Sequence, residues 1–218
     1  MSEAGTSAIK LVVFDLGRVL VRICEDWTQA CASAGIAVEA QNLGPADLLR
    51  LRDLIHQVEV DAIPFSAFAT EAGGILGATP DQISLASAAF VVGLYNGVRE
   101  LLNELAAAGV RTACLSNTNA HHWSLLSDSA HPAFFPLGDL DYQFASHLIG
   151  VRKPNEEIYA HLERETQTTG SEILFFDDVE ENIEAAQRRG WNAQWIDPAL
   201  DDPTSQIRRI LRRHRLLP

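Results

Sequence analysis

The chain has 218 residues, of which 47% are hydrophobic and 21% are charged, and its formal charge is 17 − 29 = −12. This composition excludes intrinsic disorder and suits one globular core that carries at most a modest insert. The negative charge argues against non-specific binding to nucleic acid, because phosphate backbones repel an acidic surface. A small anionic substrate stays compatible with it, since a local site can reverse the global sign.

The cysteines and the apolar runs predict a protein of the reducing cytoplasm. Cys24, Cys31 and Cys114 are odd in number and lack the C-x-x-C spacing of metal sites, so they imply no disulfide framework. The longest apolar runs, such as Ala88–Leu94, are far shorter than the ~20 residues that a bilayer requires. Residues Met1–Gly5 do not begin a secretion signal. We therefore expect no membrane contact. We also expect the protein to be a monomer or a homodimer.

Short apolar runs that end in polar residues predict the strands of a sheet. Ile9–Phe14 ends at Asp15 and is followed by Gly17. Similar runs follow at Arg111–Leu115, Ile173–Phe176 and Asn192–Ile196. In an open α/β sheet, such polar groups gather at the carboxyl edge of the strands.

Residues 24–94 interrupt this pattern and are predicted to be helical throughout. The expected helices are Asp26–Ala34, Pro45–Val58, Pro64–Ala72 and Thr79–Val92. The last one opens with a capping box, Thr79-Pro80-Asp81-Gln82. We predict that residues 24–94 form a helical cap over the sheet edge, and that residues 1–23 and 95–218 form the α/β core domain.

Helices alternate with strands in the remainder of the chain. Val98–Ala108 carries one leucine stripe and stops at Gly109, and Glu156–Glu165 and Glu181–Arg189 follow. This alternation predicts a doubly wound parallel sheet. The arginine-rich tail is interpreted as a terminal helix that buries one apolar face rather than as a basic patch for a partner, and that face comprises Ile207, Ile210 and Leu211.

Four groups of polar residues at strand ends could form one site. They are Asp15, Ser116-Asn117, Lys153-Pro154, and Asp177-Asp178 with Asn182. Taken singly, each is compatible with a helix cap or a turn. Together they indicate chemistry, because carboxylates gathered at one edge repel each other unless protons or a cation intervene. Mg²⁺ prefers such oxygen ligands, and a lysine supplies a compact charge for phosphate oxygens.

These residues resemble the motifs of the haloacid dehalogenase-like hydrolases over essentially the whole chain. The matching segments, in chain order, are Val12–Leu20 (V-V-F-D-L-G-R-V-L), Leu115–Asn119 (L-S-N-T-N), Gly150–Tyr159 (G-V-R-K-P-N-E-E-I-Y) and Phe175–Asn182 (F-F-D-D-V-E-E-N). Within the superfamily they are most similar to the branch that includes α-D-glucose-1-phosphate phosphatases. In that branch a small helical cap sets the substrate specificity.

The resemblance implies a hydrolase of small phosphomonoesters, sugar phosphates among them, that works through an aspartyl-phosphate. Asp15 would be the nucleophile. Ser116 and the backbone N–H of Asn117 would hold the phosphoryl oxygens, Lys153 would neutralise developing charge, and Asn182 would orient the lysine or the acidic pair.

The resemblance also implies a magnesium site. The Asp15 carboxylate, the Gly17 carbonyl and Asp178 would hold Mg²⁺, with Asp177 as a ligand through water or behind the direct ligands. The partner would be a small phosphorylated metabolite.

Gly17 departs from the common phosphatase motif, which has a second aspartate there as general acid and base. That function is typically worth ~10²–10⁴-fold in rate. The related branch also has glycine at this position, so activity is compatible with the change. A sugar 1-phosphate, whose anomeric oxygen leaves more easily than an ordinary alkoxide, would suffer least.

Other side chains near the motifs are candidates for moving the proton or binding phosphate. His121 and His122 follow the second motif, and Glu25 and Asp26 follow the first. Each is more simply interpreted as a surface or helix-cap residue. Arg18 either reaches the substrate phosphate or faces solvent.

Different activities are compatible with parts of this pattern. A haloacid dehalogenase would use the same aspartate without Mg²⁺, but the pair Asp177-Asp178 argues against a metal-free site. A phosphonatase needs a lysine in the cap, and residues 24–94 contain none. A phosphate-binding protein that has lost turnover is the non-enzymatic alternative.

Overall fold

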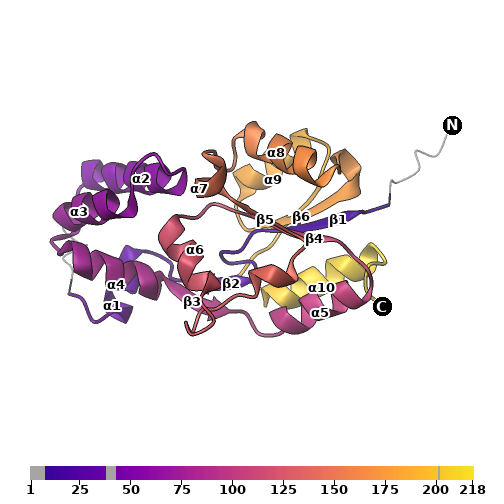
Figure 1. Cartoon of the computed structure of the whole chain (residues 1–218), viewed down its shortest axis with the longest axis horizontal. Helices are drawn as coiled ribbons and strands as arrows, with labels where there is room; N and C mark the ends of the chain where they lie inside the picture. The colour runs from indigo at the N-terminus through magenta and orange to yellow at the C-terminus, as the bar shows by residue number, and fades with distance from the viewer. Residues whose placement is uncertain (1–7, 38–42, 201) are drawn as a thin grey trace.

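The computed structural model describes residues 8–37, 43–200 and 202–218 (Figure 1). The expectations for Met1–Gly5, and for residues 38–42 of the predicted cap, lie outside the described residues. The strands are β1 (Leu11–Phe14), β2 (Val21–Ile23), β3 (Val91–Leu94), β4 (Thr112–Ser116), β5 (Tyr142–Ala145), β6 (Ile173–Asp177) and β7 (Asn192–Trp195). The α-helices are α1 (Trp27–Ser33), α2 (Pro45–Glu59), α3 (Phe65–Leu76), α4 (Pro80–Phe90), α5 (Val98–Ala107), α6 (Ala120–Ser127), α7 (Ser146–Ile149), α8 (Glu156–Thr166), α9 (Glu180–Arg188) and α10 (Pro203–Arg213).

The larger sheet of the described residues has five parallel strands in the order β5-β4-β1-β6-β7. Helices α8 and α9 lie on one face, and α5 and α10 lie on the other (Figure 1). The predicted doubly wound parallel α/β fold is therefore confirmed. β1 lies at the centre, so β4 and β6 flank the residues that follow its carboxyl end.

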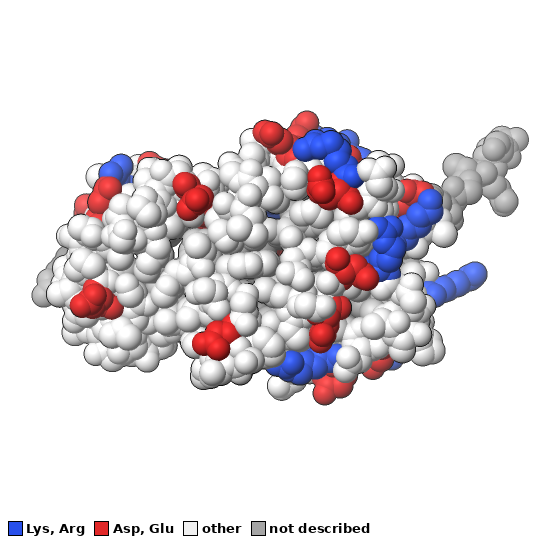
Figure 2. All heavy atoms as spheres, in the orientation of Figure 1, with Lys and Arg blue, Asp and Glu red and all other residues white. Residues whose placement is uncertain are grey.

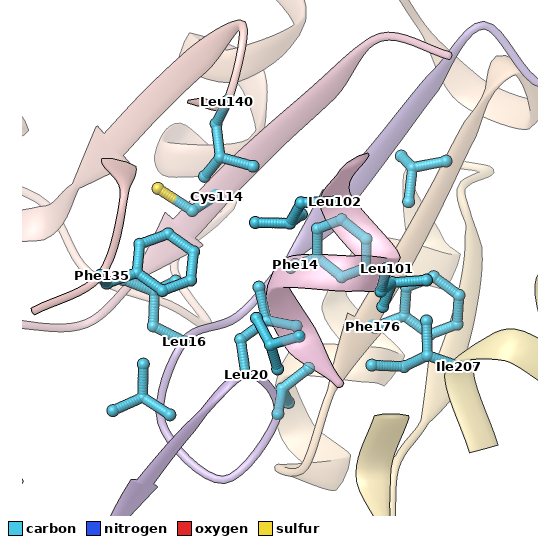
Figure 3. Packing of buried hydrophobic residues seen from close by; sticks show 14 of the residues in the cluster. Phe14, Leu16, Leu20, Leu101, Leu102, Cys114, Phe135, Leu140, Phe176 and Ile207 are labelled. Atoms are coloured by element: carbon cyan, nitrogen blue, oxygen red, sulfur yellow. The ribbon is translucent and has the colours of Figure 1, made fainter. Parts of the chain in front are cut away.

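The side chains of β1 alternate between the two faces because successive residues of a strand point in opposite directions. Phe14 packs with Leu101 of α5 and Ile207 of α10, and its ring stacks on Phe176 at a centroid distance of 5.5 Å (Figure 3). Val13 belongs to a second buried cluster, which includes side chains of α8 and α9. Burial on both faces explains why these strands are continuously apolar in sequence.

Helices α1 to α4 form an insert between β2 and β3, and they lie to one side of the sheet layers (Figure 1). β2 and β3 pair as an antiparallel ribbon at the base of the insert. Helix α1 packs on α4, α4 on α3 and α3 on α2, around a buried cluster that includes Leu54, Phe68 and Ile83. The insert also contacts the core, through α4 against α6 and α2 against α7.

The prediction that residues 24–94 are helical throughout is wrong at their C-terminal end. Helix α4 ends at Phe90 rather than at Val92, and Val91–Leu94 form β3. Val91 has an extended backbone, and the Phe90 carbonyl accepts a hydrogen bond from the Cys24 backbone N–H at 2.9 Å. Pairing with β2 thus overrides the helical pattern, because a short apolar run has no decisive period of its own.

Local signals at helix ends are confirmed. The Thr79 hydroxyl accepts from the Gln82 N–H at 3.2 Å, and the Gln82 side chain accepts from the Thr79 N–H at 2.9 Å. Gly109 follows α5 with φ +71°, a left-handed conformation that glycine adopts without steric cost.

The C-terminal segment packs on the core as expected. Ile207, Ile210 and Leu211 of α10 are buried, and Arg208 forms an ion pair with Glu104 of α5. The cysteines are free and buried. Among the residues that the structure describes, no helix combines the length and apolar character that crossing a membrane requires.

Candidate active site

The predicted site residues meet at the carboxyl edge of the sheet. Asp15 follows β1, Ser116 is the last residue of β4 and Asp177 is the last residue of β6. Because β4 and β6 both pair with β1 in parallel, their ends converge. Lys153, from the loop between α7 and α8, and Asn182 of α9 contact this edge.

Lys153 is the buried centre of the cluster. Its ammonium nitrogen Nζ lies 3.0 Å from Asp15 Oδ1 and 2.6 Å from Asp177 Oδ2, and only 1% of its side chain is exposed. Asn182 donates from Nδ2 to both oxygens of Asp177, at 3.0 and 3.1 Å. The backbone N–H of Val179 donates to Asp177 Oδ1 at 2.9 Å. Asp177 is thereby held in one orientation and in turn positions the lysine.

Asp178 completes an acidic cluster with Asp15 and Asp177. One carboxylate oxygen of each lies within 4.8 Å of the others. Arg18 approaches Asp178 to 3.8 Å and donates to the Glu25 carbonyl at 3.2 Å. The Lys153 ammonium, which is closer to the carboxylates than Arg18, is the main positive charge that balances the cluster. One ammonium cannot balance three carboxylates, so the site keeps an excess of negative charge.

The pKa values reflect this excess. Burial raises the pKa of Asp15 to about 7; the Lys153 ammonium opposes the rise, and Asp177 and Asp178 add to it. Burial, and then the charge of Asp177, raise the pKa of Asp178. Burial alone would lower the pKa of Lys153, but Asp15 and Asp177 hold it above its usual value. A further cation would lower the pKa of Asp15 and favour its nucleophilic, ionised form.

Asn117 joins the lysine loop to β4. Its Nδ2 donates to the Lys153 carbonyl at 3.0 Å, and its Oδ1 accepts from the Lys153 N–H at 2.8 Å. The Asn117 side chain is thus occupied within the protein. Ser116 is buried beside it.

A cavity of about 260 Å³ opens beside these residues, between the sheet edge and the insert. Gly17, Ser116 and Asn117 lie at its polar end, and side chains of α1, α2 and α3 form much of its wall. At Gly17, an added Cβ would meet only the end of the Ile23 side chain, at 3.3 Å. The backbone therefore has room for a small side chain at this position.

The two histidines after the second motif, His121 and His122, contact residues of the insert. His122 lines the cavity, but its Nε2 lies 2.9 Å from Ser87 Oγ and 3.0 Å from the Ser87 carbonyl. Burial, and then the neighbouring His121, lower the pKa of His122 to about 4. It is therefore neutral at pH 7 and lacks the imidazolium proton that a general acid would donate. His121 stacks on Phe65 of α3, at a centroid distance of 4.2 Å.

Glu25 and Asp26 have helix-capping contacts. Asp26 is the N-cap of α1 and accepts from the Gln29 N–H at 2.8 Å. The Glu25 backbone N–H donates to the Gln29 side chain at 2.6 Å. Asp26 is therefore a helix-cap residue, and Glu25 is an exposed residue whose backbone contacts the same helix.

Sequence reasoning missed two groups that support the site. Glu59, at the end of α2, lines the cavity and accepts from Arg152 Nε at 2.8 Å, which ties the insert to the residue before Lys153. Tyr159 donates from its hydroxyl to the Asn182 carbonyl at 3.1 Å. Tyr159 belongs to a quoted motif, but Glu59 has no sequence signal, because its partner is distant along the chain.

The fold and the site are those of a known hydrolase superfamily. The family model for haloacid dehalogenase-like hydrolases matches residues 9–190. The chain therefore belongs to the haloacid dehalogenase-like hydrolases, as its motifs predicted.

Curated relatives include proteins named as phosphatases. A sesquiterpene phosphatase of Aspergillus oryzae is 35% identical over 97 residues, which cover 41% of this chain and 44% of that protein. This match thus spans less than half the length of that relative. A D-ribitol-5-phosphate phosphatase of Bacteroides thetaiotaomicron is 28% identical over 195 residues, which cover 84% of this chain and 89% of that one.

Solved structures show the same fold. A haloacid dehalogenase family enzyme of Bacteroides thetaiotaomicron has a TM-score of 0.76 and 25% identity, covering 89% of this chain and 97% of its own. The magnesium complex of that enzyme has a TM-score of 0.73 and 25% identity, covering 93% of this chain and 100% of its own.

Proposed function

We propose that this protein is a Mg²⁺-dependent hydrolase of small phosphomonoesters that works through an aspartyl-phosphate on Asp15. The observation that carries the proposal is the cluster of Asp15, Asp177 and Asp178, the first two of which contact one buried lysine, beside a cavity that Ser116 lines. A metal-free dehalogenase site would have little use for so many carboxylates. The phosphatase names of the curated relatives support phosphorus as the point of attack.

The donor set suits Mg²⁺, which binds carboxylate and carbonyl oxygens and tolerates several waters. Asp15, the Gly17 carbonyl and Asp178 would hold the ion, with Asp177 behind them. When bound, Mg²⁺ supplies charge stabilisation for the phosphoryl oxygens. The magnesium complex of the Bacteroides enzyme supports this choice of ion.

The remaining steps belong to the chain's own residues. Asp15 attacks phosphorus and forms the aspartyl-phosphate, which water then hydrolyses. The Ser116 hydroxyl and the Asn117 backbone N–H hold the phosphoryl oxygens, and the Lys153 ammonium balances the charge that develops on them. Asn182 acts through Asp177, whose orientation it holds.

The insert of α1–α4 acts in this proposal as the cap. It covers the sheet edge and provides most of the surface that the leaving group meets. Because Gly17 provides no acid, the alcohol leaves without a proton from this position, and the identity of the leaving group matters more than usual.

Phosphate release tests the proposal. We expect turnover of para-nitrophenyl phosphate and ethyl phosphate with Mg²⁺, its loss in EDTA, and its loss in Asp15→Asn. Asp139→Asn is the matched control, because Asp139 is an exposed aspartate outside the site. A protein that binds phosphate analogues tightly with Mg²⁺ but releases no phosphate would instead be the non-enzymatic binder.

A further inference from the structure

The cavity beside the candidate nucleophile is polar at one end and apolar along its wall. Gly17, Ser116 and Asn117 form the polar end. The wall is lined by Ile23, Trp27, Ile55, Val58, Phe68 and Phe90, all from the insert or its connecting strand. Figure 2 shows that charged side chains are sparser on the visible face of this insert than on that of the α/β core.

Three polar side chains of the cavity lining have partners within the protein. His122 is hydrogen-bonded to Ser87, and Asn119 Oδ1 accepts from the His122 N–H at 3.0 Å. Glu59 is paired with Arg152 across the insert boundary. A sugar or polyol in this space would bury most of its hydroxyls against rings and aliphatic chains, where an unpaired hydroxyl is penalised.

The volume admits a sizeable hydrocarbon. At about 260 Å³, the cavity exceeds the ~150 Å³ of an apolar cavity that accommodates benzene. With the phosphoryl group held at Ser116, the organic part extends along the apolar wall.

We propose that the substrate is the phosphate monoester of an apolar alcohol whose hydrocarbon part is larger than a benzene ring. This inference rests on the proposed phosphatase function and specifies its substrate class. The reaction balances as hydrolysis: the bond between phosphorus and the alcohol oxygen breaks, water gives its hydroxyl to phosphorus, and its proton goes to the alcohol. The products are a hydrocarbon alcohol and inorganic phosphate.

A chain-length series tests the substrate class. We expect kcat/KM to rise roughly fourfold per methylene from ethyl phosphate upward, the factor equivalent to burying one methylene at ~0.8 kcal/mol. The rise ends when the cavity is full. D-Ribitol 5-phosphate and glucose 1-phosphate are the polar comparison. A kcat/KM that does not change with alkyl chain length would overturn the inference. So would kcat/KM values that are higher for the polyol and the sugar phosphates than for the long alkyl phosphates.

Substitution of the wall ties the effect to the cavity. Ile55→Asn places an amide on the wall, and we expect it to reduce kcat/KM for the longest alkyl phosphate at least tenfold more than for ethyl phosphate. Leu48→Asn is the control, because Leu48 lies on the same helix α2 but is 54% exposed. If Ile55→Asn does not fold, Ile55→Ala enlarges the cavity and should move the optimum to longer chains. Equal losses at all chain lengths would contradict the assignment.

The test also separates this inference from the proposed function. Turnover of ethyl phosphate and para-nitrophenyl phosphate without an alkyl-length effect would overturn the inference alone. If no ester is hydrolysed, calorimetric titration with alkylphosphonates in Mg²⁺ decides the question. A Kd that falls with chain length would then support the apolar ligand site and refute only the hydrolysis, and a constant Kd would refute both.

Discussion

Lys153 connects the acidic residues of the site to Asn117, at the end of strand β4. Its ammonium bridges Asp15 and Asp177, while its backbone is hydrogen-bonded on both sides to the Asn117 amide. A buried ammonium with two carboxylate partners is costly to disrupt, because removing one partner leaves the other charge uncompensated. At the residue scale, a change to Asp15, Lys153 or Asp177 therefore affects the charge balance of the other two.

Gly17 offers a gain-of-function prediction. Gly17→Asp would restore an acidic group two residues after the candidate nucleophile, and its Cβ would displace only the end of the Ile23 side chain. We expect kcat to rise up to ~10²-fold on alkyl phosphates, whose alkoxide needs a proton, and little on para-nitrophenyl phosphate, whose phenolate leaves readily. Steady-state kinetics on both esters checks it; equal changes on both would contradict the acid role.

His122 carries a pH-dependent part of the stability. Its pKa is about 4 in the folded protein and 6.5 in its ordinary state. Between these values the unfolded chain binds more protons, so the free energy of unfolding falls as the pH falls through this window. We expect His122→Gln to show a shallower fall, measured by urea denaturation at several pH values between the two limits. Parallel profiles for both proteins would refute this.

At the scale of elements, the turn from α3 to α4 depends on a close backbone approach. Gly77 ends α3 in a left-handed conformation at φ +68°, and the Ala78 N–H donates to the Gly73 carbonyl at 2.9 Å. A Cβ at Gly73 would lie 2.5 Å from the Ala78 carbonyl oxygen, whereas a Cβ at Gly74 would meet nothing within 4 Å. Adjacent glycines of one helix thus have opposite requirements.

This difference gives a matched pair of variants. Gly73→Ala should destabilise the protein by about 1–3 kcal/mol, because the backbone must shift to relieve the overlap. Gly74→Ala should stabilise it by about 1 kcal/mol through helix propensity alone. Urea denaturation gives both free energies of unfolding, and a Gly73→Ala variant as stable as Gly74→Ala would show that the turn adapts freely.

At the scale of the whole molecule, the negative charge of the site that Lys153 leaves unbalanced opposes folding, and a bound cation would reduce this cost. The chain carries a formal charge of −12, and the carboxylates of the site are drawn together from β1 and the end of β6. An ion that binds only the folded protein adds to its stability in proportion to the logarithm of its concentration, ~2.7 kcal/mol at a hundred times its Kd.

Magnesium should therefore raise the melting temperature. For a chain of this size each kcal/mol corresponds to roughly 2–4 °C. We expect a rise of several degrees with MgCl₂ that Asp178→Asn reduces and Asp139→Asn preserves, measured by differential scanning calorimetry. NaCl at equal ionic strength controls for screening, and an equal rise in NaCl would contradict specific binding.

Much of the core followed from local patterns. The apolar runs that became β1, β4, β6 and β7 end in polar residues, and Thr79 and Gly109 mark helix ends by backbone chemistry that needs no distant partner. The strand β5 (Tyr142–Ala145) escaped prediction because its alternation of polar and apolar residues is weak. β3 escaped because its apolar run continued the pattern of α4 until β2 paired with it.

The sequence by itself determined the fold class and the polar residues that were expected to meet, because parallel strands necessarily bring their carboxyl ends to one edge. It also marked Gly17, where the common phosphatase motif has an aspartate. Only the tertiary structure decided that His122 is bonded to Ser87, that Glu59 pairs with Arg152, and that an apolar wall faces Ser116. Those features depend on how the insert packs against the core, and contacts between segments far apart in the chain leave no local pattern to detect.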